Sequence, residues 1–169
     1  MPSQLFSPIT LAGTTFDNRL VISPMCQYSA DEGLMNDWHT MHLGSLANSG
    51  ADLLVIEATA VERAGRITHG CVGLWSDAHE IAIRRVVEAC RRFGTAKVGI
   101  QLGHAGRKAS AKRPWEGKSL NEPEIDDPWP TSAPSALPFG EGWHVPRAMS
   151  ANEIEALVPK FAEATRRAD

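Results

Sequence analysis

The chain has 169 residues, of which 43% are hydrophobic and 22% are charged, and its formal net charge is −3. This length and composition predict a single globular domain with a sizeable core, and the charge is too evenly balanced for a nucleic-acid-binding surface. No apolar run approaches the ~20 residues that would cross a bilayer, and the N-terminus lacks the apolar segment of a signal peptide.

The N-terminal segment predicts a hairpin followed by a buried strand. Short β-prone pieces at Phe6–Ile9 and Thr14–Phe16 lie around Ala12-Gly13. Leu20–Ser23 is a short apolar run of the kind that forms a strand buried on both faces. Pro24 ends this strand, because proline has no N–H for a central ladder.

A helix and a second strand are predicted next. Asn36 or Asp37 can cap a helix that runs to about Ser49, since the side-chain oxygens of Asn and Asp accept the free N–H groups of a helix start. The apolar run Leu53–Ile56 then predicts a second buried strand, which ends at Glu57–Ala60. A polar loop that contains several glycines follows this strand.

The next helix has the clearest pattern in the chain. Asp77 and Glu80 have the spacing of a capping box, and Gly94 stands where such a helix would end. Its apolar positions, at i, i+3, i+4 and i+7, are Ile83, Val86, Val87 and Cys90. A third strand, Lys97–Leu102, then leads into the segment Gly103–Arg107.

Residues 108–149 are predicted to be a long loop excursion within a single partial domain that spans 1–169. This stretch contains seven prolines and three of the five tryptophans, and loops of such length are usually functional or disordered. Its aromatic content favours an ordered excursion, because disordered segments contain few aromatic residues. A second capping box, Ser150 with Glu153, then begins a helix that runs to the end of the chain.

The predicted order of elements is β-α-β-α-β, a long loop and α. Alternating strands and helices indicate a parallel sheet with helical crossovers. A closed barrel of eight such units has about 250 residues, and three strands cannot close a barrel. We therefore predict an α/β fold that forms the N-terminal portion of a (β/α)8 barrel.

In such a barrel the reactive groups lie at the carboxyl ends of the strands. Three of these ends are predicted here, at residues 23–28, 58–60 and 101–107. Each end carries polar or reactive side chains. These three segments are therefore the first places in which to look for a site.

Cys26 is one of three cysteines that are far apart and form no Cys-x-x-Cys pair, so free thiols in a reducing cytoplasm are expected. Its thiol can be a nucleophile, a group that tunes a redox centre, or a plain buried side chain, which is the commonest state of a free cysteine. Tyr28, the only tyrosine, can donate a hydrogen bond to a substrate carbonyl or be an ordinary half-buried residue. Gln101 can hold the amide edge of a heterocycle or bond to backbone.

The histidines indicate a site less clearly. His39 and His42 have the i, i+3 spacing of a metal pair, but a crossover helix faces the sheet or solvent, so no metal site is predicted. His104 follows a strand end and is a better candidate, although the glycines beside it suggest a demanding turn in which it only positions the loop. The sequence contains no P-loop, dinucleotide-binding or α/β-hydrolase motif.

Several segments are informative when they are taken together. They are Ser23–Tyr28, Glu57–Val61 with Gly65–Ile67, Gly73–Asp77, and Gln101–Arg107. In their order along essentially the whole chain they closely resemble the Old Yellow Enzyme family, in particular its bacterial thermophilic-like branch of ene-reductases. The resemblance implies a (β/α)8 barrel in which NADPH or NADH reduces FMN, and the reduced flavin passes a hydride to the β-carbon of an enone or enal.

The resemblance also implies roles for individual residues. The residues that would line the flavin, largely through backbone contacts, are Ser23, Pro24, Met25 and Cys26. Cys26 would lie near the reactive edge of the ring and tune its potential, which favours a functional interpretation of this thiol. Ala58 would offer backbone hydrogen bonds to the ring, Gln101 would bond to its pyrimidine edge, and Tyr28 would reach toward the substrate oxygen. A flavin needs a few fixed polar contacts of this kind, because the cofactor itself carries the hydride chemistry.

Other parts of the family's site do not occur in this sequence. The resemblance implies a later His–His or His–Asn pair for the substrate oxygen, a tyrosine proton donor, a flavin-binding arginine and phosphate-binding loops. We therefore expect this chain to act with the C-terminal half of the barrel or with another copy of itself. The alternative is a catalytically silent partial barrel that needs a partner chain or self-association, because open strand edges invite pairing. Neither nucleic acid nor a membrane is an expected partner.

Overall fold

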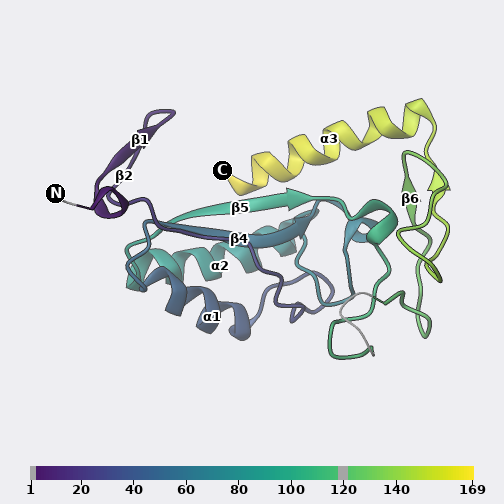
Figure 1. The fold of residues 1–169 in the computed structure, drawn as a ribbon, viewed down its shortest axis with the longest axis horizontal. Coiled ribbons are helices and arrows are strands. Elements are labelled where there is room, and N and C mark those ends of the chain that lie inside the picture. The colour runs from purple at the N-terminus through teal and green to yellow at the C-terminus, as the bar shows by residue number, and fades with distance from the viewer. Residues whose placement is uncertain (1–2, 118–121) are drawn as a thin grey trace.

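A computed structural model describes residues 3–117 and 122–169, and Figure 1 shows how its elements are arranged. Residues 118–121, which belong to the predicted excursion at 108–149, lie outside the described residues. The strands are β1 (Ile9–Leu11), β2 (Thr14–Phe16), β3 (Val21–Ile22), β4 (Leu53–Ala60), β5 (Lys97–Gly103), β6 (Ser132–Ala133) and β7 (Arg147–Ala148). The α-helices are α1 (Asp37–Ala47), α2 (Asp77–Phe93) and α3 (Ala151–Ala168), and short 3-10 turns cover Gln4–Phe6, Arg63–Gly65 and Gly106–Lys108.

The central sheet is parallel and has the order β3-β4-β5. β4 and β5 keep a regular register from Leu53 to Ile56. The register then shifts between Ile56 and Ala58, so that Glu57 is an extra residue in β4 and Ala58 pairs with Gln101. A bulge of this kind changes the direction of the side chains that follow it, and here it lies at the strand ends where the site is predicted.

One face of the sheet carries the hydrophobic core. Figure 1 shows α1 and α2 lying together along this face. From β4, the side chains of Leu54 and Ile56 are almost completely buried. The helices contribute Leu43, Ala47, Ile83, Val86 and Cys90. On the opposite face, Leu53 and Val55 are only half-buried, so the described residues cover the sheet on one side far better than on the other.

The N-terminal hairpin is present, but its first strand is Ile9–Leu11 and not the predicted Phe6–Ile9. Pro8 cannot donate to a ladder, so strand pairing begins only after it. The turn Ala12-Gly13 has positive φ at both residues, 47° and 84°, as two-residue hairpin turns of this type require.

The strand predicted at Leu20–Ser23 is shorter and less buried than expected. Only Val21–Ile22 pairs with β4, and the Val21 side chain is 56% exposed. β3 is an edge strand of this sheet within the described residues. Val21 pairs with Leu53 and so lies on the face of the sheet that the described residues leave poorly covered, whereas a strand buried on both faces needs a covering layer on each.

Two of the predicted helix starts are confirmed. Asn36 caps α1 by accepting the Trp38 N–H, and the His39 side chain accepts the Asn36 N–H in return. Ser150 and Glu153 form the capping box of α3. Among the described residues, no helix combines the length and the apolar character needed to cross a membrane.

The capping box predicted for α2 is wrong. Ser76 precedes the helix, and its hydroxyl pairs with Nδ1 of His79 at 2.6 Å and makes no capping bond to a backbone N–H group. The carboxylates of Asp77 and Glu80 bind Arg167 instead, at 2.7 and 3.0 Å. These ion pairs join the end of α3 to the beginning of α2.

The described part of 108–149 lies against the loop that follows β4. The indole N–H of Trp129 donates to the carbonyl of Ala64 at 3.2 Å. The Arg66 guanidinium lies near two tryptophan rings, 5.6 Å from the centre of Trp129 and 5.9 Å from that of Trp75. These contacts hold the excursion close to the carboxyl end of the sheet.

Candidate functional site

The carboxyl ends of β3, β4 and β5 lie at one edge of the sheet, as their parallel order requires. A cavity of about 170 Å³ lies at the ends of β4 and β5. Its lining includes Ala58, Cys71, Gln101 and His104. Because small-molecule sites typically occupy ~300–1,000 Å³, the described residues form only part of a complete site.

Two of the predicted site residues, Ala58 and Gln101, line this cavity and are paired across β4 and β5. The Gln101 side chain is exposed at the strand end. Cys26 joins them, because the Ala58 backbone N–H donates to its thiol. The predicted residues that lie outside the cavity lining are Ser23, Pro24, Met25, Cys26 and Tyr28, and of these Cys26 touches the lining through Ala58 and Cys71. The structure therefore brings together a backbone amide, a thiol and a side-chain amide.

Two thiols meet beside this cavity. The side chain of Cys26 forms a hydrogen bond with Cys71, which also accepts the Thr68 backbone N–H at 3.3 Å. The hydrogen bond from Cys26 and the hydrogen bonds from Thr68 lower the pKa of Cys71. The hydrogen bond between the two thiols and the burial of Cys26 raise the pKa of Cys26, so Cys26 remains a protonated thiol. The sequence offers no signal for Cys71, because its contact with Cys26 joins distant parts of the chain.

Tyr28 is held in a backbone conformation that side chains rarely adopt. Its φ is 52°, in the left-handed region. Gly70 packs directly against it, since a Cβ at Gly70 would stand 2.1 Å from the Tyr28 carbonyl oxygen. The ring packs edge-on against Trp115, with 6.0 Å between ring centres. Burial raises the pKa of Tyr28, so its phenol remains a hydrogen-bond donor.

Glu57 is a buried carboxyl group that sequence reasoning assigns no role. It is 3% exposed, and its Oε2 accepts the Gln27 backbone N–H at 3.1 Å. Its Oε1 lies 3.8 Å from Nε2 of His39, which is completely buried. Burial raises the pKa of Glu57 to about 8 and lowers that of His39 to about 4. The sequence signal that could have identified Glu57 is a charged residue within the otherwise apolar strand Leu53–Ala60.

His104 lies in the cavity lining, but both of its ring nitrogens are occupied. Nδ1 accepts the Gly106 backbone N–H at 3.0 Å, so the proton lies on Nε2, which donates to Glu62 at 2.8 Å. Glu62 also binds Lys160 of α3. Of the two interpretations of His104, the structure favours the one in which it positions its loop. Within 3–117 and 122–169, no three His, Cys, Asp or Glu side chains form a group that could hold a metal ion.

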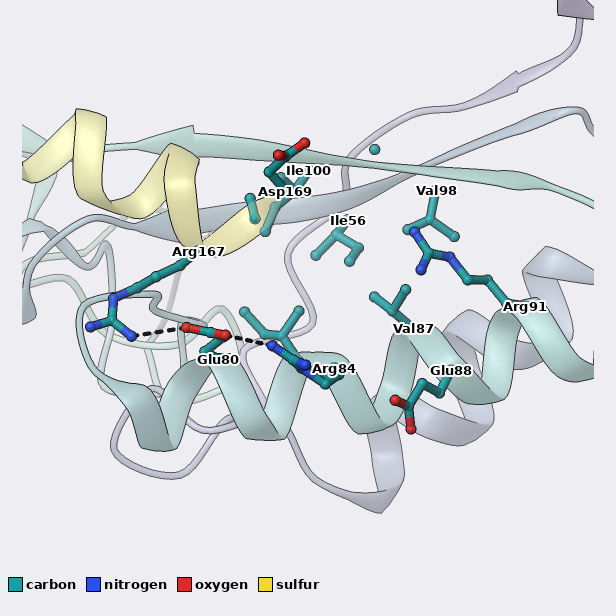
Figure 2. Close-up of a pocket in the computed structure, with 13 residues that line it drawn as sticks. Ile56, Glu80, Arg84, Val87, Glu88, Arg91, Val98, Ile100, Arg167 and Asp169 are labelled. Atoms are coloured by element: carbon teal, nitrogen blue, oxygen red, sulfur yellow. Dashed lines mark hydrogen bonds and ion pairs between the residues drawn. The ribbon is translucent and has the colours of Figure 1, made fainter.

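A larger cavity, of about 380 Å³, lies between α2, β5 and the end of α3 (Figure 2). Its lining includes the apolar side chains of Ile56 and Val98. Figure 2 shows Arg84 and Arg167 directed toward Glu80, to which both are ion-paired. The lining includes none of the predicted site residues, and it lies on the helix-covered side of the sheet. The smaller cavity at the strand ends is therefore the candidate site.

Known proteins of similar sequence align along almost the whole chain. Residues 4–169 match the model of the NADH:flavin oxidoreductase / NADH oxidase family. An NADH:flavin oxidoreductase from Gibberella zeae is 42% identical over 169 residues, which cover 98% of this chain and 41% of the relative. An NADPH dehydrogenase from a Geobacillus species is 39% identical over 170 residues, which cover 99% of this chain and 45% of the relative. The chain thus spans less than half the length of these relatives.

Solved structures agree with this comparison. Morphinone reductase matches with a TM-score of 0.78 at 26% identity, over 97% of this chain and 44% of that chain. An Old Yellow Enzyme from Pichia matches with a TM-score of 0.79 at 24% identity, over 99% of this chain and 43% of that chain, which supports the fold. These neighbours are TIM barrels, so the predicted fold is confirmed as the N-terminal portion of a (β/α)8 barrel. The chain belongs to the NADH:flavin oxidoreductase / NADH oxidase family, a family of oxidoreductases that use FMN with NADH or NADPH as reductant.

Proposed function

We propose that this chain contributes one wall of the FMN site of an ene-reductase. Such an enzyme uses NADPH or NADH to reduce the C=C bond of α,β-unsaturated carbonyl compounds. The observation that carries the proposal is the pairing of Ala58 with Gln101 beside the Cys26 thiol. These groups come from three strand ends, which is where barrel enzymes bind their cofactors.

The polar groups at this edge suit the ring of a flavin. The Gln101 side chain is exposed and has no hydrogen-bond partner among the described residues, so its amide can both donate and accept along a pyrimidine edge. Cys26 is a neutral thiol, since contact with Cys71 and burial raise its pKa, and it would place no charge against the ring. FMN supplies the hydride chemistry when it is bound. We further propose that Ser23, Pro24 and Met25 line the ring through their backbone.

Tyr28 is proposed to orient the substrate. Burial raises the pKa of its phenol, so the O–H group is available to donate to the carbonyl oxygen of an enone. A hydrogen bond at this oxygen stabilises the negative charge that develops there when hydride reaches the β-carbon. The close contact with Gly70 holds the Tyr28 backbone in place, which limits the directions that the phenol can take.

The competing proposal is a catalytically silent partial barrel that is stable only with a partner. Apolar side chains remain exposed on β3 and α3: Val21 by 56%, Ile154 by 45% and Val158 by 67%. Exposed apolar surface and an open strand edge favour association, either with the C-terminal half of a barrel or with another copy of the chain. We also propose a cytoplasmic location, because Cys26, Cys71 and Cys90 are all free thiols in the structure.

An FMN titration separates the two proposals. The chain is mixed with FMN, alone and together with the C-terminal half of the Geobacillus NADPH dehydrogenase, and flavin fluorescence and absorbance are recorded. The ene-reductase proposal predicts that the complemented barrel binds FMN and oxidises NADPH when cyclohexenone is added. Gln101→Leu should weaken FMN binding about tenfold, because it removes the hydrogen bonds of one side chain. Gln4→Leu, the same change at an exposed position, should leave the affinity unchanged.

Two other outcomes contradict the ene-reductase proposal. A complemented barrel that binds FMN and oxidises NADPH without consuming cyclohexenone would show a flavin enzyme of another specificity. A chain that binds no FMN in either sample would support the silent barrel. Size-exclusion chromatography of the same samples would then show whether the chain associates with itself.

A further inference from the structure

A carboxyl group is buried directly behind the turn that carries Cys26 and Tyr28. Glu57 is only 3% exposed, although it is charged in its usual state and lies on a strand of the core. It is the extra residue of the bulge between β4 and β5. Bulges near active sites often serve to redirect a side chain, and here the redirected side chain points away from solvent.

Glu57 holds the backbone of the turn at its central amide. Its Oε2 accepts the N–H of Gln27, the residue between Cys26 and Tyr28, at 3.1 Å. The side chain of Gln27 donates to the carbonyl of Met25 at 2.9 Å and accepts the indole N–H of Trp38 at 3.3 Å, and neither bond involves its backbone amide. The bond to Glu57 is therefore the contact that ties this amide to the sheet.

The other oxygen of Glu57 is backed by His39. Nδ1 of His39 lies 3.1 Å from both the backbone N–H and the side-chain oxygen of Asn36, so this ring nitrogen is engaged at the start of α1. Nε2 of His39 is buried without a hydrogen-bond partner in the described residues, and the atom it faces is Oε1 of Glu57 at 3.8 Å. Asn36 also donates to the carbonyl of Ser29 at 2.7 Å, so the start of α1 supports both Glu57 and the end of the turn.

The turn needs this support because its conformation is unfavourable. Tyr28 has a φ of 52°, a region that residues other than glycine rarely occupy unless the surrounding structure imposes it. Beyond Tyr28, the Ala30 N–H donates to the carbonyl of Gly70 at 2.9 Å. The strained residue is thus held on one side by Glu57 and on the other by Gly70.

We propose that Glu57 is a positioning residue, whose carboxyl group, backed by His39, fixes the turn that presents Cys26 and Tyr28 to the cofactor site. The statement that this turn faces a flavin site rests on the proposed function. The statement that Glu57 sets the backbone conformation at Tyr28 is independent of the proposed function, and it can be tested without a cofactor.

The chain contains one tyrosine, so biosynthetic labelling with 3-fluorotyrosine gives a single fluorine NMR signal at the turn. Glu57→Gln retains an oxygen that can accept the Gln27 N–H, whereas Glu57→Met has similar length and no such oxygen. Glu88→Gln changes an exposed carboxyl group on α2 and serves as the control. The fluorine signal is recorded for each variant, together with hydrogen exchange of the Gln27 amide.

We expect Glu57→Gln and the control to keep the wild-type fluorine signal. Glu57→Met should shift or broaden it and speed exchange of the Gln27 amide about tenfold or more, because a buried hydrogen bond is lost. The Cys26 thiol should also react faster with a thiol reagent, while Cys71 and Cys90 are buried. A Glu57→Met chain that keeps both the wild-type signal and the slow exchange overturns the proposal.

If Glu57→Met does not fold, a comparison of wild type with Glu57→Gln tests the proposal. The Gln27 amide proton signal should move with a midpoint near pH 8 in wild type, because burial raises the pKa of Glu57 to about 8, and this movement should be absent from Glu57→Gln. His39, Cys26, Tyr28 and Cys71 also interact with Glu57, and they are present in both chains. A Gln27 signal that titrates identically in both overturns the proposal. None of these measurements uses flavin, so they stand apart from a failure of FMN binding.

Discussion

Replacing Glu57 with glutamine is expected to change how the stability of the chain depends on pH. Burial raises the pKa of Glu57 from 4.5 to about 8 in the folded protein. Between these values the folded state holds a proton that the unfolded state has released. The stability linked to this group is therefore fully present below pH 4.5 and is lost as the pH rises through 8. Glutamine has no proton to lose, so the variant lacks this decline.

The size of the effect follows from the same linkage. A difference of one bound proton between the folded and unfolded states changes the free energy of unfolding by ~1.4 kcal/mol per pH unit. From about pH 6 to about pH 8 the folded carboxyl goes from protonated to half-ionised, which gives about 2 kcal/mol. The Glu57 side chain is 3% exposed, so solvent screening reduces this figure little. Glu57→Gln should therefore gain about 2 kcal/mol relative to wild type over this range.

Urea unfolding in the presence of a thiol reductant, repeated across this pH range, measures the difference between the two chains. Burial lowers the pKa of His39 from 6.5 to about 4, so this residue also makes stability depend on pH near 6.5, but both chains contain His39 and its effect cancels in the difference. The lowered pKa of Cys71 acts in the opposite direction, but both chains contain Cys71, so the difference isolates Glu57. Glu88→Gln, which changes an exposed carboxyl group, should show no such trend. A difference between wild type and Glu57→Gln that stays flat from pH 6 to 8 would refute the raised pKa of Glu57.

Further substitutions test the packing around the site. Gly70→Ala should destabilise the chain by about 1–3 kcal/mol, because a Cβ there meets the Tyr28 carbonyl oxygen at 2.1 Å; an unchanged urea midpoint would contradict this contact. Leu54→Ala should lower the free energy of unfolding by about 2–5 kcal/mol, since the side chain is 1% exposed in the core, and a loss below this range would indicate loose packing. Arg66→Met should loosen 108–149 by removing the contact with the Trp129 ring and the two bonds to the carbonyls of Arg63 and His69, which order the loop against which this segment lies. Limited proteolysis should then cut this segment faster, and an unchanged rate would show that Arg66 does not anchor it.

The alternation of strands and helices could be predicted because its signals are local. Ile83, Val86 and Cys90 recur at helical spacing, and they are among the residues that α2 buries. The apolar run Leu53–Ile56 is the beginning of β4. Alternating strands and helices in turn require a parallel sheet, so the shared edge of the three strand ends could be predicted as well.

The incorrect or missing predictions depend on contacts between distant residues. Asp77 is already the first residue of α2, after the N-cap Ser76. Its carboxylate and that of Glu80 bind Arg167, 90 residues after Asp77 in the chain. Cys71 lines the cavity and contacts Cys26, which lies 45 residues before it in the chain. A single sequence contains no pattern that connects such pairs, so neither contact could be predicted from it.

The bulge at Glu57 links the buried carboxyl group to the position of the candidate site. Side chains alternate between the two faces of a regular strand, so without an extra residue Ala58 would follow Leu54 and Ile56 onto the face that the helices cover. One inserted residue changes the face of every side chain that follows it, and it brings Ala58 into register with Gln101. Glu57 would thus serve two purposes, since its backbone sets the register of the strand end and its side chain holds the neighbouring turn. The motif at this strand end therefore has a structural reason for an acidic residue within an apolar strand, whether or not that residue ever contacts a cofactor.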